Sequence, residues 1–214
     1  MCLLNPVTCL QKLKYVGTLF CATVNRKGEP QVRCISGIHF EDDALYFVTA
    51  KGKDFARQLL SDGRIQIAGL TRYGELIRLS GTVEQCSGSA AVKMRDQIFA
   101  AHPELADTYP GTTRGIIAVF ALKDMVVDYF DNKRSPIFRD SYVIGSAEIT
   151  PHGYHITDAC TECGRCVVAC PEGVIEEGSP YEIEQHHCLR CGACQEVCPV
   201  GAVVSLPLAD SQDS

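Results

Sequence analysis

The sequence predicts a mainly β barrel with a few helices, followed by a small cysteine-rich module of the α+β class. Two observations support this fold class. Short β-branched segments separated by turn residues occupy the first 130 residues, and eight of the 13 cysteines lie between positions 160 and 198. Short, closely spaced strands are typical of closed or split barrels, because a doubly wound sheet needs a helix between successive parallel strands.

The individual elements follow from the spacing of apolar side chains. Helices are expected at residues 7–15, 53–61 and 89–101. Strands are expected at residues 16–25, 31–38, 44–49, 64–70, 76–84, 115–122 and 125–130. Residues 131–150 are expected to form an extension and linker. We therefore divide the chain into a barrel domain at 1–150, a cysteine-rich domain at 151–208 and a polar tail at 209–214.

Composition is that of an ordinary globular protein, with 46% hydrophobic and 21% charged residues. No stretch approaches the ~20 apolar residues of a transmembrane helix, and no basic run indicates nucleic-acid binding. The first residues lack the basic and apolar regions of a signal peptide, and thirteen cysteines suit a reducing compartment. We therefore expect a cytoplasmic protein that binds neither membrane nor nucleic acid.

Charge is unevenly distributed along the chain. Residues 152–206 contain eight acidic and two basic side chains, whereas residues 1–151 contain 16 acidic and 18 basic ones. An acidic module beside a mildly basic one is consistent with docking to a partner, and equally with plain solubility.

Two cysteine runs share one pattern. The run C-x2-C-x2-C-x3-C-P begins at Cys160 and recurs 28 residues later at Cys188. In this spacing three thiolates wrap one cubane cluster, and the fourth ligates the cluster of the other run. Zinc sites and disulfides also use paired cysteines, but a doubled run of this form is typical of neither. The sequence predicts two [4Fe–4S] clusters, one held by Cys160, Cys163, Cys166 and Cys198, the other by Cys188, Cys191, Cys194 and Cys170.

Residues 157–206 closely resemble the bacterial two-[4Fe–4S] ferredoxins. The resemblance extends to the Cys-Pro-Glu-Gly and Cys-Pro-Val-Gly segments that end the two runs. His186 and His187 precede Cys188, but eight cysteines already complete two clusters. We therefore expect these histidines beside the ligands or at the surface, and not as ligands.

Three segments of the barrel domain together resemble the FMN-binding split barrel of the pyridoxamine 5′-phosphate oxidase-like superfamily. They are G-T-L-F-C-A-T-V-N-R-K-G-E-P-Q-V-R-C-I-S at 17–36, A-L-Y-F-V-T-A-K-G-K-D-F-A-R-Q-L at 44–59 and I-R-L-S-G-T-V-E at 77–84. The resemblance covers residues 13–130. It implies a homodimer with FMN at the subunit interface.

Carried over position by position, the resemblance implies a set of FMN contacts. It places along the edge of the isoalloxazine and ribityl chain Arg33, Cys34, Ile35 and Ser36. The phosphate would be held, with support from Gln58, by Thr49, Ala50, Lys51, Gly52 and Lys53. The neighbouring subunit's flavin would be reached by Arg78 and Ser80. A phosphate dianion favours cationic and hydroxyl donors and a helix N-terminus. From spacing alone, the lysines also fit solvated turn positions, and the arginines an exposed strand face. The oxidase's C-terminal arginine–histidine motif is missing, so pyridoxamine phosphate is not the expected substrate.

Together the two modules predict an iron–sulfur flavoprotein in which electrons pass through the clusters to or from FMN, which reduces a small-molecule acceptor. A redox partner protein would then exchange electrons with the clusters. No Rossmann glycine fingerprint is present, and no catalytic residue is predicted. Two alternatives stay open: a non-catalytic electron-transfer protein between redox partners, and a redox sensor that binds flavin, haem or deazaflavin.

Overall fold

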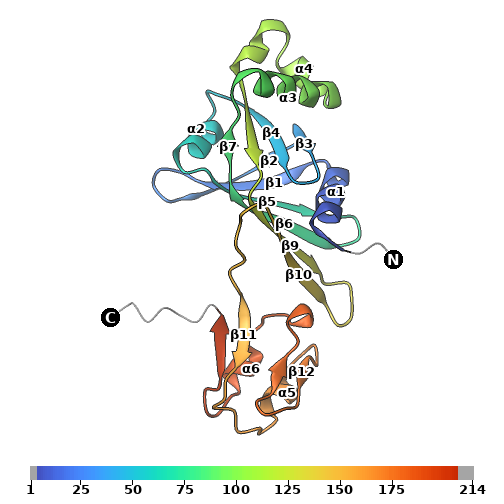
Figure 1. Ribbon diagram of the computed structural model, residues 1–214, viewed down its shortest axis with the longest axis vertical. Helices are drawn as coiled ribbons and strands as arrows, with labels where there is room; N and C mark the ends of the chain where they lie inside the picture. Colours follow the sequence, from blue (N-terminus) through green and yellow to red (C-terminus); the bar gives the residue numbers. More distant parts are fainter. Residues whose placement is uncertain (1–3, 207–214) are drawn as a thin grey trace. The chain divides into compact units, whose positions relative to one another are not determined.

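The computed structural model describes residues 4–206, which form two compact units (Figure 1). The first unit comprises the chain up to Tyr129 together with Ser141–Glu148. The second comprises Phe130–Asp140 together with the chain from Ile149 onward. The second unit therefore includes the segment Phe130–Asp140, which is separated in sequence from the rest of that unit by Ser141–Glu148 of the first unit.

Two β-sheets form the frame of the first unit. The larger has the strand order β10-β9-β6-β5-β1-β2, and its strands are β1 (Leu19–Val24), β2 (Pro30–Ile35), β5 (Arg64–Leu70), β6 (Glu75–Thr82), β9 (Met125–Asp131) and β10 (Phe138–Ile144). The smaller has the order β3-β4-β8-β7, with β3 (Ile38–Phe40), β4 (Leu45–Ala50), β7 (Glu84–Gln85) and β8 (Ile117–Leu122). Strand β1 pairs antiparallel with β2 and β5, and β4 pairs antiparallel with β3 and β8.

Helices pack against the strands of these two sheets. They are α1 (Pro6–Val16), α2 (Asp54–Ser61), α3 (Gly88–Ala101), α4 (Glu104–Thr108) and the 3₁₀ helix η1 (Gly111–Ile116). Helix α1 begins with a capping box, in which Asn5 Oδ1 accepts from Thr8 N at 2.9 Å and Thr8 Oγ1 accepts from Asn5 N at 2.8 Å. These bonds satisfy two backbone donors that a helix end otherwise leaves without partners.

The core of the first unit follows from alternation along the strands. In β1, Leu19 and Cys21 are fully buried, while Phe20 between them is 57% exposed. Strand β8 differs because all six of its residues are buried, which explains its unbroken apolar sequence I-A-V-F-A-L. Phe120 of β8 stacks on Phe47 with ring centroids 5.8 Å apart.

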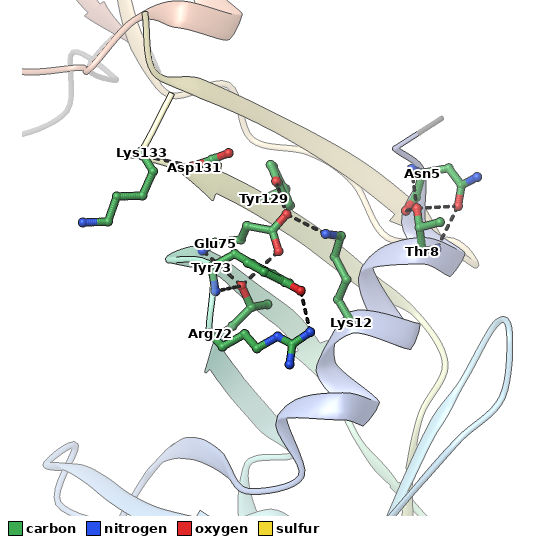
Figure 2. A network of polar contacts seen from close by, with 10 residues as sticks. Asn5, Thr8, Lys12, Arg72, Tyr73, Glu75, Tyr129, Asp131 and Lys133 are labelled. Atoms are coloured by element: carbon green, nitrogen blue, oxygen red, sulfur yellow. Dashed lines mark hydrogen bonds and ion pairs between the residues drawn. The ribbon is translucent and has the colours of Figure 1, made fainter. Parts of the chain in front are cut away.

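A buried carboxylate ties three of these elements together (Figure 2). Glu75, at the start of β6, accepts hydrogen bonds from Lys12 Nζ of α1 at 2.5 Å and from Tyr129 Oη of β9 at 2.7 Å. Its other oxygen accepts from Thr71 Oγ1 at 2.9 Å. Burial raises the pKa of Glu75, but these hydrogen bonds and the Lys12 charge outweigh it, so the pKa lies below its ordinary value.

The second unit is built on a repeat of 28 residues. Strand β11 (Gly153–Ile156) pairs with β14 (Val203–Leu206), and β12 (Ile175–Glu176) pairs with β13 (Glu182–Ile183). Its helices are α5 (Arg165–Ala169), α6 (Ala193–Glu196) and the 3₁₀ helix η2 (Gln185–His187). Helix α6 and strand β14 begin 28 residues after α5 and β12, so the spacing of the cysteine runs is also the spacing of the structure.

The structure agrees with the mainly β barrel and the small α+β module, and it differs at residues 131–150. The expected extension contains strand β10, which belongs to the larger sheet. Residues Phe130–Asp140, here called the hairpin tip, join β9 to β10 and pack within the second unit. Helix α4 and strand β3 were also not predicted, since each has at most five residues and thus no full period of apolar spacing. No helix among residues 4–206 has the length and apolar character needed to cross a membrane.

Replacing Glu75 by glutamine should lower the free energy of unfolding by about 1–3 kcal/mol, because Lys12 then faces a neutral partner in a buried site. A carboxylate with a lowered pKa contributes stability above its unfolded pKa of about 4.3, and that stability is lost as the pH falls through the folded pKa. The difference between wild type and variant should therefore be equal at pH 6 and pH 8. Anaerobic denaturant unfolding followed by circular dichroism measures it.

The exposed Glu84 provides the matched control, and its replacement by glutamine should change stability little. Equal stability of Glu75→Gln and Glu84→Gln would show that the Glu75 network does not hold α1 and β9 in place.

Candidate functional site

The cysteines of the second unit surround two separate cavities. The first cavity is lined by Cys160, Cys163, Cys166 and Cys198. The second cavity is lined by Cys170, Cys188, Cys191 and Cys194. Each cavity thus receives three cysteines from one run and the last cysteine of the other run. Because each cavity has four cysteines, the two cavities can hold the same kind of group.

Backbone N–H groups point at the sulfurs of both cavities. Glu162 N donates to Cys160 Sγ at 3.4 Å, and Arg190 N donates to Cys188 Sγ at 3.3 Å. Both donors lie in left-handed backbone conformations, with φ of 56° at Glu162 and 59° at Arg190. Hydrogen bonds to a ligand sulfur stabilise the thiolate and influence the reduction potential of a cluster that it holds.

The two sites fit iron–sulfur clusters better than single zinc ions. A zinc ion draws four thiolate sulfurs to about 2.3 Å from one centre, so it needs little space of its own. Among residues 4–206, no three Cys, His, Asp or Glu side chains lie close enough together to share a single metal ion. An iron–sulfur cubane, in which each thiolate binds a different iron, suits this arrangement.

The thiols differ in how readily they give up their protons. Burial raises the pKa of Cys194 to about 11, and it also raises the pKa of Cys188. At Cys198, burial acts in the same direction, but backbone N–H groups from Val200 to Val203 outweigh it and lower the pKa. Burial also raises the pKa of Cys166 in the first cavity, so iron that binds either group of cysteines must displace protons.

The cysteines are also much of the core of the second unit. Cys166, Cys188 and Cys194 are each 8% exposed, and they pack with a small apolar set made up of Ile156, Val174, Ile175, Ile183 and Val203. So few large side chains stabilise a domain poorly, and small domains of this kind usually depend on metals or disulfides. We therefore expect folding of this unit to be coupled to filling of its cavities.

In the first unit, Arg33 and Gln58 are joined in one polar cluster. Arg33 Nη2 donates to Gln58 Oε1 at 2.8 Å, and Arg33 Nη1 donates to Thr23 Oγ1 at 2.5 Å. Thr23 Oγ1 also donates to Gln58 Oε1 at 2.6 Å, and the Arg33 guanidinium lies 4.6 Å from the centroid of the Phe55 ring. Helix α2 supplies both Gln58 and Phe55, so it fixes the position of the arginine.

The predicted phosphate segment forms the turn between β4 and α2. Thr49 and Ala50 are buried at the end of β4, whereas Lys51, Gly52 and Lys53 are exposed. Lys51 Nζ donates to Gly115 O at 3.2 Å, and Lys53 Nζ lies 6.0 Å from the centroid of the Tyr109 ring. Lys53 is the N-cap of α2 and makes no side-chain cap, so the first N–H groups of the helix are open to a ligand.

The remaining predicted FMN residues lie in, or next to, strands of the larger sheet. The pairing of neighbouring strands puts four residues in one row across the sheet, in the order Cys34 (β2), Phe20 (β1), Ala68 (β5) and Arg78 (β6). This row lies on the face of the sheet opposite the buried core. Arg78 Nη2 donates to Asp128 Oδ2 at 2.8 Å. Ile35 is buried on the core side, Ser36 is exposed after β2, and Ser80 lies two residues beyond Arg78 on the same face.

Most of the predicted FMN residues therefore fall into three groups: the Arg33–Gln58 cluster, the exposed turn at Lys51–Lys53, and the outer row that contains Cys34 and Arg78. The others lie outside these groups, since Ile35, Thr49 and Ala50 are buried and Ser36 follows β2. Sequence reasoning missed Thr23, Phe55 and Asp128, which hold the two arginines. The strand alternation offered a signal for Thr23, because it places this polar residue on the same face as the buried Leu19 and Cys21, and diagonal to Arg33 across the β1–β2 pair.

Comparisons with known proteins agree with this division. The pyridoxamine 5′-phosphate oxidase family matches residues 8–121, and the 4Fe-4S dicluster domain matches residues 152–199. Residues of the cysteine module are 53% identical over 35 positions to a ferredoxin of Butyribacterium methylotrophicum, a stretch that is 16% of this chain and 64% of that ferredoxin. The chain thus spans less than two thirds of that relative.

Solved structures resemble the first unit. A NimC/NimA family protein from Clostridium acetobutylicum has a TM-score of 0.55 and 23% identity, over 65% of this chain and 93% of that one. A heme binding protein from Mycobacterium smegmatis also has a TM-score of 0.55, with 16% identity over 67% of this chain and 60% of that one. PhzG from Burkholderia lata, in complex with tetrahydrophenazine-1-carboxylic acid, has a TM-score of 0.52 and 17% identity, over 66% and 88% of the two chains.

The fold and the two cysteine cavities define a flavin-binding type of split barrel fused to an iron–sulfur module of the ferredoxin class. The chain belongs to the pyridoxamine 5′-phosphate oxidase family, whose match covers more than half of its length.

Replacing Cys194 by serine should abolish much of the visible iron–sulfur absorbance and lower the iron content, since a serine hydroxyl in this buried site ligates iron poorly. Limited proteolysis within residues 149–206 should become faster, because the unit loses part of its core. Cys86→Ser, in the first unit, is the matched control and should leave both readouts unchanged. Full iron content in Cys194→Ser would exclude Cys194 as a ligand.

Proposed function

We propose that the chain is an iron–sulfur flavoprotein that takes single electrons into two [4Fe–4S] clusters and delivers pairs of electrons, through FMN, to a small-molecule acceptor. The observation that supports this most directly is the presence of two four-cysteine cavities in the same chain as an oxidase-family barrel. A barrel that accepted hydride from a dinucleotide would need no clusters.

The eight cysteines of the two cavities would hold the clusters, and the turn after β4 would hold the FMN phosphate. Lys51 and Lys53 provide positive charge there, and the N-terminus of α2 provides open N–H groups. At Gly52, a Cβ atom would meet no other atom within 4 Å, so the turn leaves space for a ligand. Arg33, held by Thr23 and Gln58, provides a third cation with a fixed position.

A second copy of the chain would complete the flavin site. The outer face of the larger sheet exposes apolar side chains that a monomer has no reason to leave in water: Phe20 is 57% exposed, Val32 68% and Leu70 60%. Cys34 and Arg78 lie on this same face. A homodimer formed through it would bring the two residues to the interface at which the resemblance places FMN.

The electrons balance in a simple scheme. A low-potential electron-carrier protein gives up two electrons, one at a time, and the acceptor gains both together with two protons. FMN, when bound, supplies the exchange between one-electron and two-electron chemistry. The acidic character of residues 152–206 favours a donor protein with a basic docking surface.

Anaerobic purification with measurement of iron, acid-labile sulfide and extracted flavin tests the cofactors directly. About eight irons and one FMN per chain are expected. Eight irons without FMN would overturn the flavin assignment, and haem or deazaflavin would then be sought in the same extract. Zinc in place of iron would overturn the cluster assignment.

Electron flow is tested by stopped-flow reduction of the loaded protein with reduced ferredoxin. The clusters should bleach first and the flavin second, and added nitro, quinone or conjugated acceptors should reoxidise both. Flavin that stays oxidised beside reduced clusters would contradict the proposed path. Fast exchange with a partner protein without turnover of any acceptor would instead indicate a non-catalytic electron carrier.

Lys53→Gln should weaken FMN binding about 10- to 100-fold, the value of one charge-assisted hydrogen bond of about 1.5–3 kcal/mol. Fluorescence titration of flavin-depleted protein with FMN measures the Kd, and riboflavin, which lacks the phosphate, should bind both proteins alike. Lys27→Gln, in the exposed turn between β1 and β2, serves as the control. A similar loss for riboflavin would show that Lys53 does not contact the phosphate.

A further inference from the structure

The turn that follows β4 rests against the 3₁₀ helix η1. Strand β4 pairs antiparallel with β8, and Ala50 at the end of β4 lies opposite Ile117 at the start of β8. Lys51 N donates to Ile116 O at 2.9 Å, and Lys51 Nζ donates to Gly115 O at 3.2 Å. The FMN contacts predicted from the sequence include this turn but no residue of η1.

Arg114 of η1 and Lys53 of the turn lie on one small apolar cluster. The Arg114 guanidinium lies 4.8 Å from the centroid of the Phe99 ring. Phe99, from α3, is buried together with the last residue of β4 and the first residue of β8, and Tyr109 packs against this group. Lys53 Nζ lies 6.0 Å from the centroid of the Tyr109 ring. The cluster thus brings the two cations to the same corner of the first unit.

The Arg114 side chain has hydrogen-bond donors that the chain does not use. Its Nε is buried and has no acceptor among residues 4–206, and its guanidinium forms no ion pair with any of them. Arg33 of the same unit, by comparison, donates to Gln58 and Thr23. A buried donor without an acceptor is unfavourable, so this arginine calls for an acceptor that comes from outside the chain.

The charge at this corner favours an anion. Residues 51–61 and 88–116, which form the turn, α2, α3, α4, η1 and their connections, contain six lysine or arginine side chains and four carboxylates. Three of these carboxylates are paired with other side chains: Asp54 with Arg57, Asp96 with Arg95 and Glu104 with His102. The fourth, Asp107, is exposed and forms no ion pair with the described residues. No carboxylate of these elements is therefore paired with Arg114 or with the lysines of the turn.

We propose that Arg114, together with Lys53, binds the phosphate of FMN and makes the barrel select a flavin with a terminal phosphate monoester. A guanidinium offers parallel N–H donors to two oxygens of one phosphate, and the phosphate would supply the acceptor that Nε lacks. A terminal monoester has three free oxygens and close to two negative charges at neutral pH, whereas a phosphate esterified on both sides, as in FAD, has fewer of both. Arg114 therefore favours FMN over riboflavin and FAD. The inference rests on the proposed binding of FMN.

Fluorescence titration of the flavin-depleted, iron-loaded full-length protein gives the Kd for FMN, riboflavin and FAD. Arg114→Gln should weaken FMN binding about 10- to 100-fold, as expected for the loss of a hydrogen bond between charged groups, and should leave riboflavin binding unchanged. The ratio of the Kd for FAD to the Kd for FMN should fall in this variant. Arg114→Lys should retain part of the FMN affinity, because lysine keeps the charge but not the paired donors.

Arg95→Gln is the matched control. Arg95 lies on α3, as Phe99 does, but its guanidinium is bonded to Asp96. This variant should bind all three flavins as wild type does. A second measurement separates binding from packing: without flavin, the unfolding midpoint of Arg114→Gln should lie close to that of wild type, whereas the stabilisation that FMN adds should be smaller.

Failure of the inference and failure of the proposed function give different results. Wild-type protein that binds neither FMN nor riboflavin refutes the flavin assignment itself. Wild-type protein that binds FMN, with Arg114→Gln binding it equally well, refutes only the role of Arg114. An Arg114→Gln variant that unfolds earlier and loses riboflavin as strongly as FMN does the same, because Arg114 then only supports Phe99. Equal losses for FMN and FAD would overturn the selection of a monoester.

Discussion

The grouping of eight cysteines around two cavities is the constraint on which the second unit depends. Its buried residues are few and small, and Cys166, Cys188 and Cys194 make up a large part of them. Eight thiols gathered around two cavities repel one another once they are ionised. Bound iron would neutralise the thiolates and join the two halves of the repeat, because each cavity takes its fourth cysteine from the other run. In the proposed iron-loaded protein, folding and cofactor binding would therefore be a single process in this unit.

The first unit is stabilised in a different way. Its strand β8 is buried along its whole length, and Glu75 links α1, β6 and β9 with no cofactor involved. Arg33 likewise finds Thr23, Gln58 and Phe55 within the chain. A frame that satisfies its own polar groups can hold the turn at Lys51–Lys53 open to solvent. A rigid frame that presents an exposed, positively charged loop favours the binding of an anionic ligand.

Much of this architecture could be predicted, because its signals are local. The strand at residues 64–70 was predicted with the bounds that the structure gives, since I-Q-I alternates clearly. The cysteine grouping followed from spacing alone. Strand β10 was missed because F-R-D-S-Y-V-I is polar where a strand in a barrel is expected to alternate, and its tip is held by Glu172 and His187, far along the chain. The partners of Arg33 were missed for the same reason, since α2 and β1 meet only in the folded chain.

The repeat shows which features both halves of the cysteine module require. Glu162 and Arg190 adopt a left-handed backbone that costs a non-glycine residue roughly 1–2 kcal/mol, and each uses it to direct an N–H group at a sulfur. Either residue would have a less strained backbone in another conformation, so the N–H to sulfur hydrogen bond is what keeps this backbone conformation. The side chain at this position faces no such demand and is glutamate in one half and arginine in the other. Backbone donors therefore make the two cavities alike, and side-chain charge makes them different.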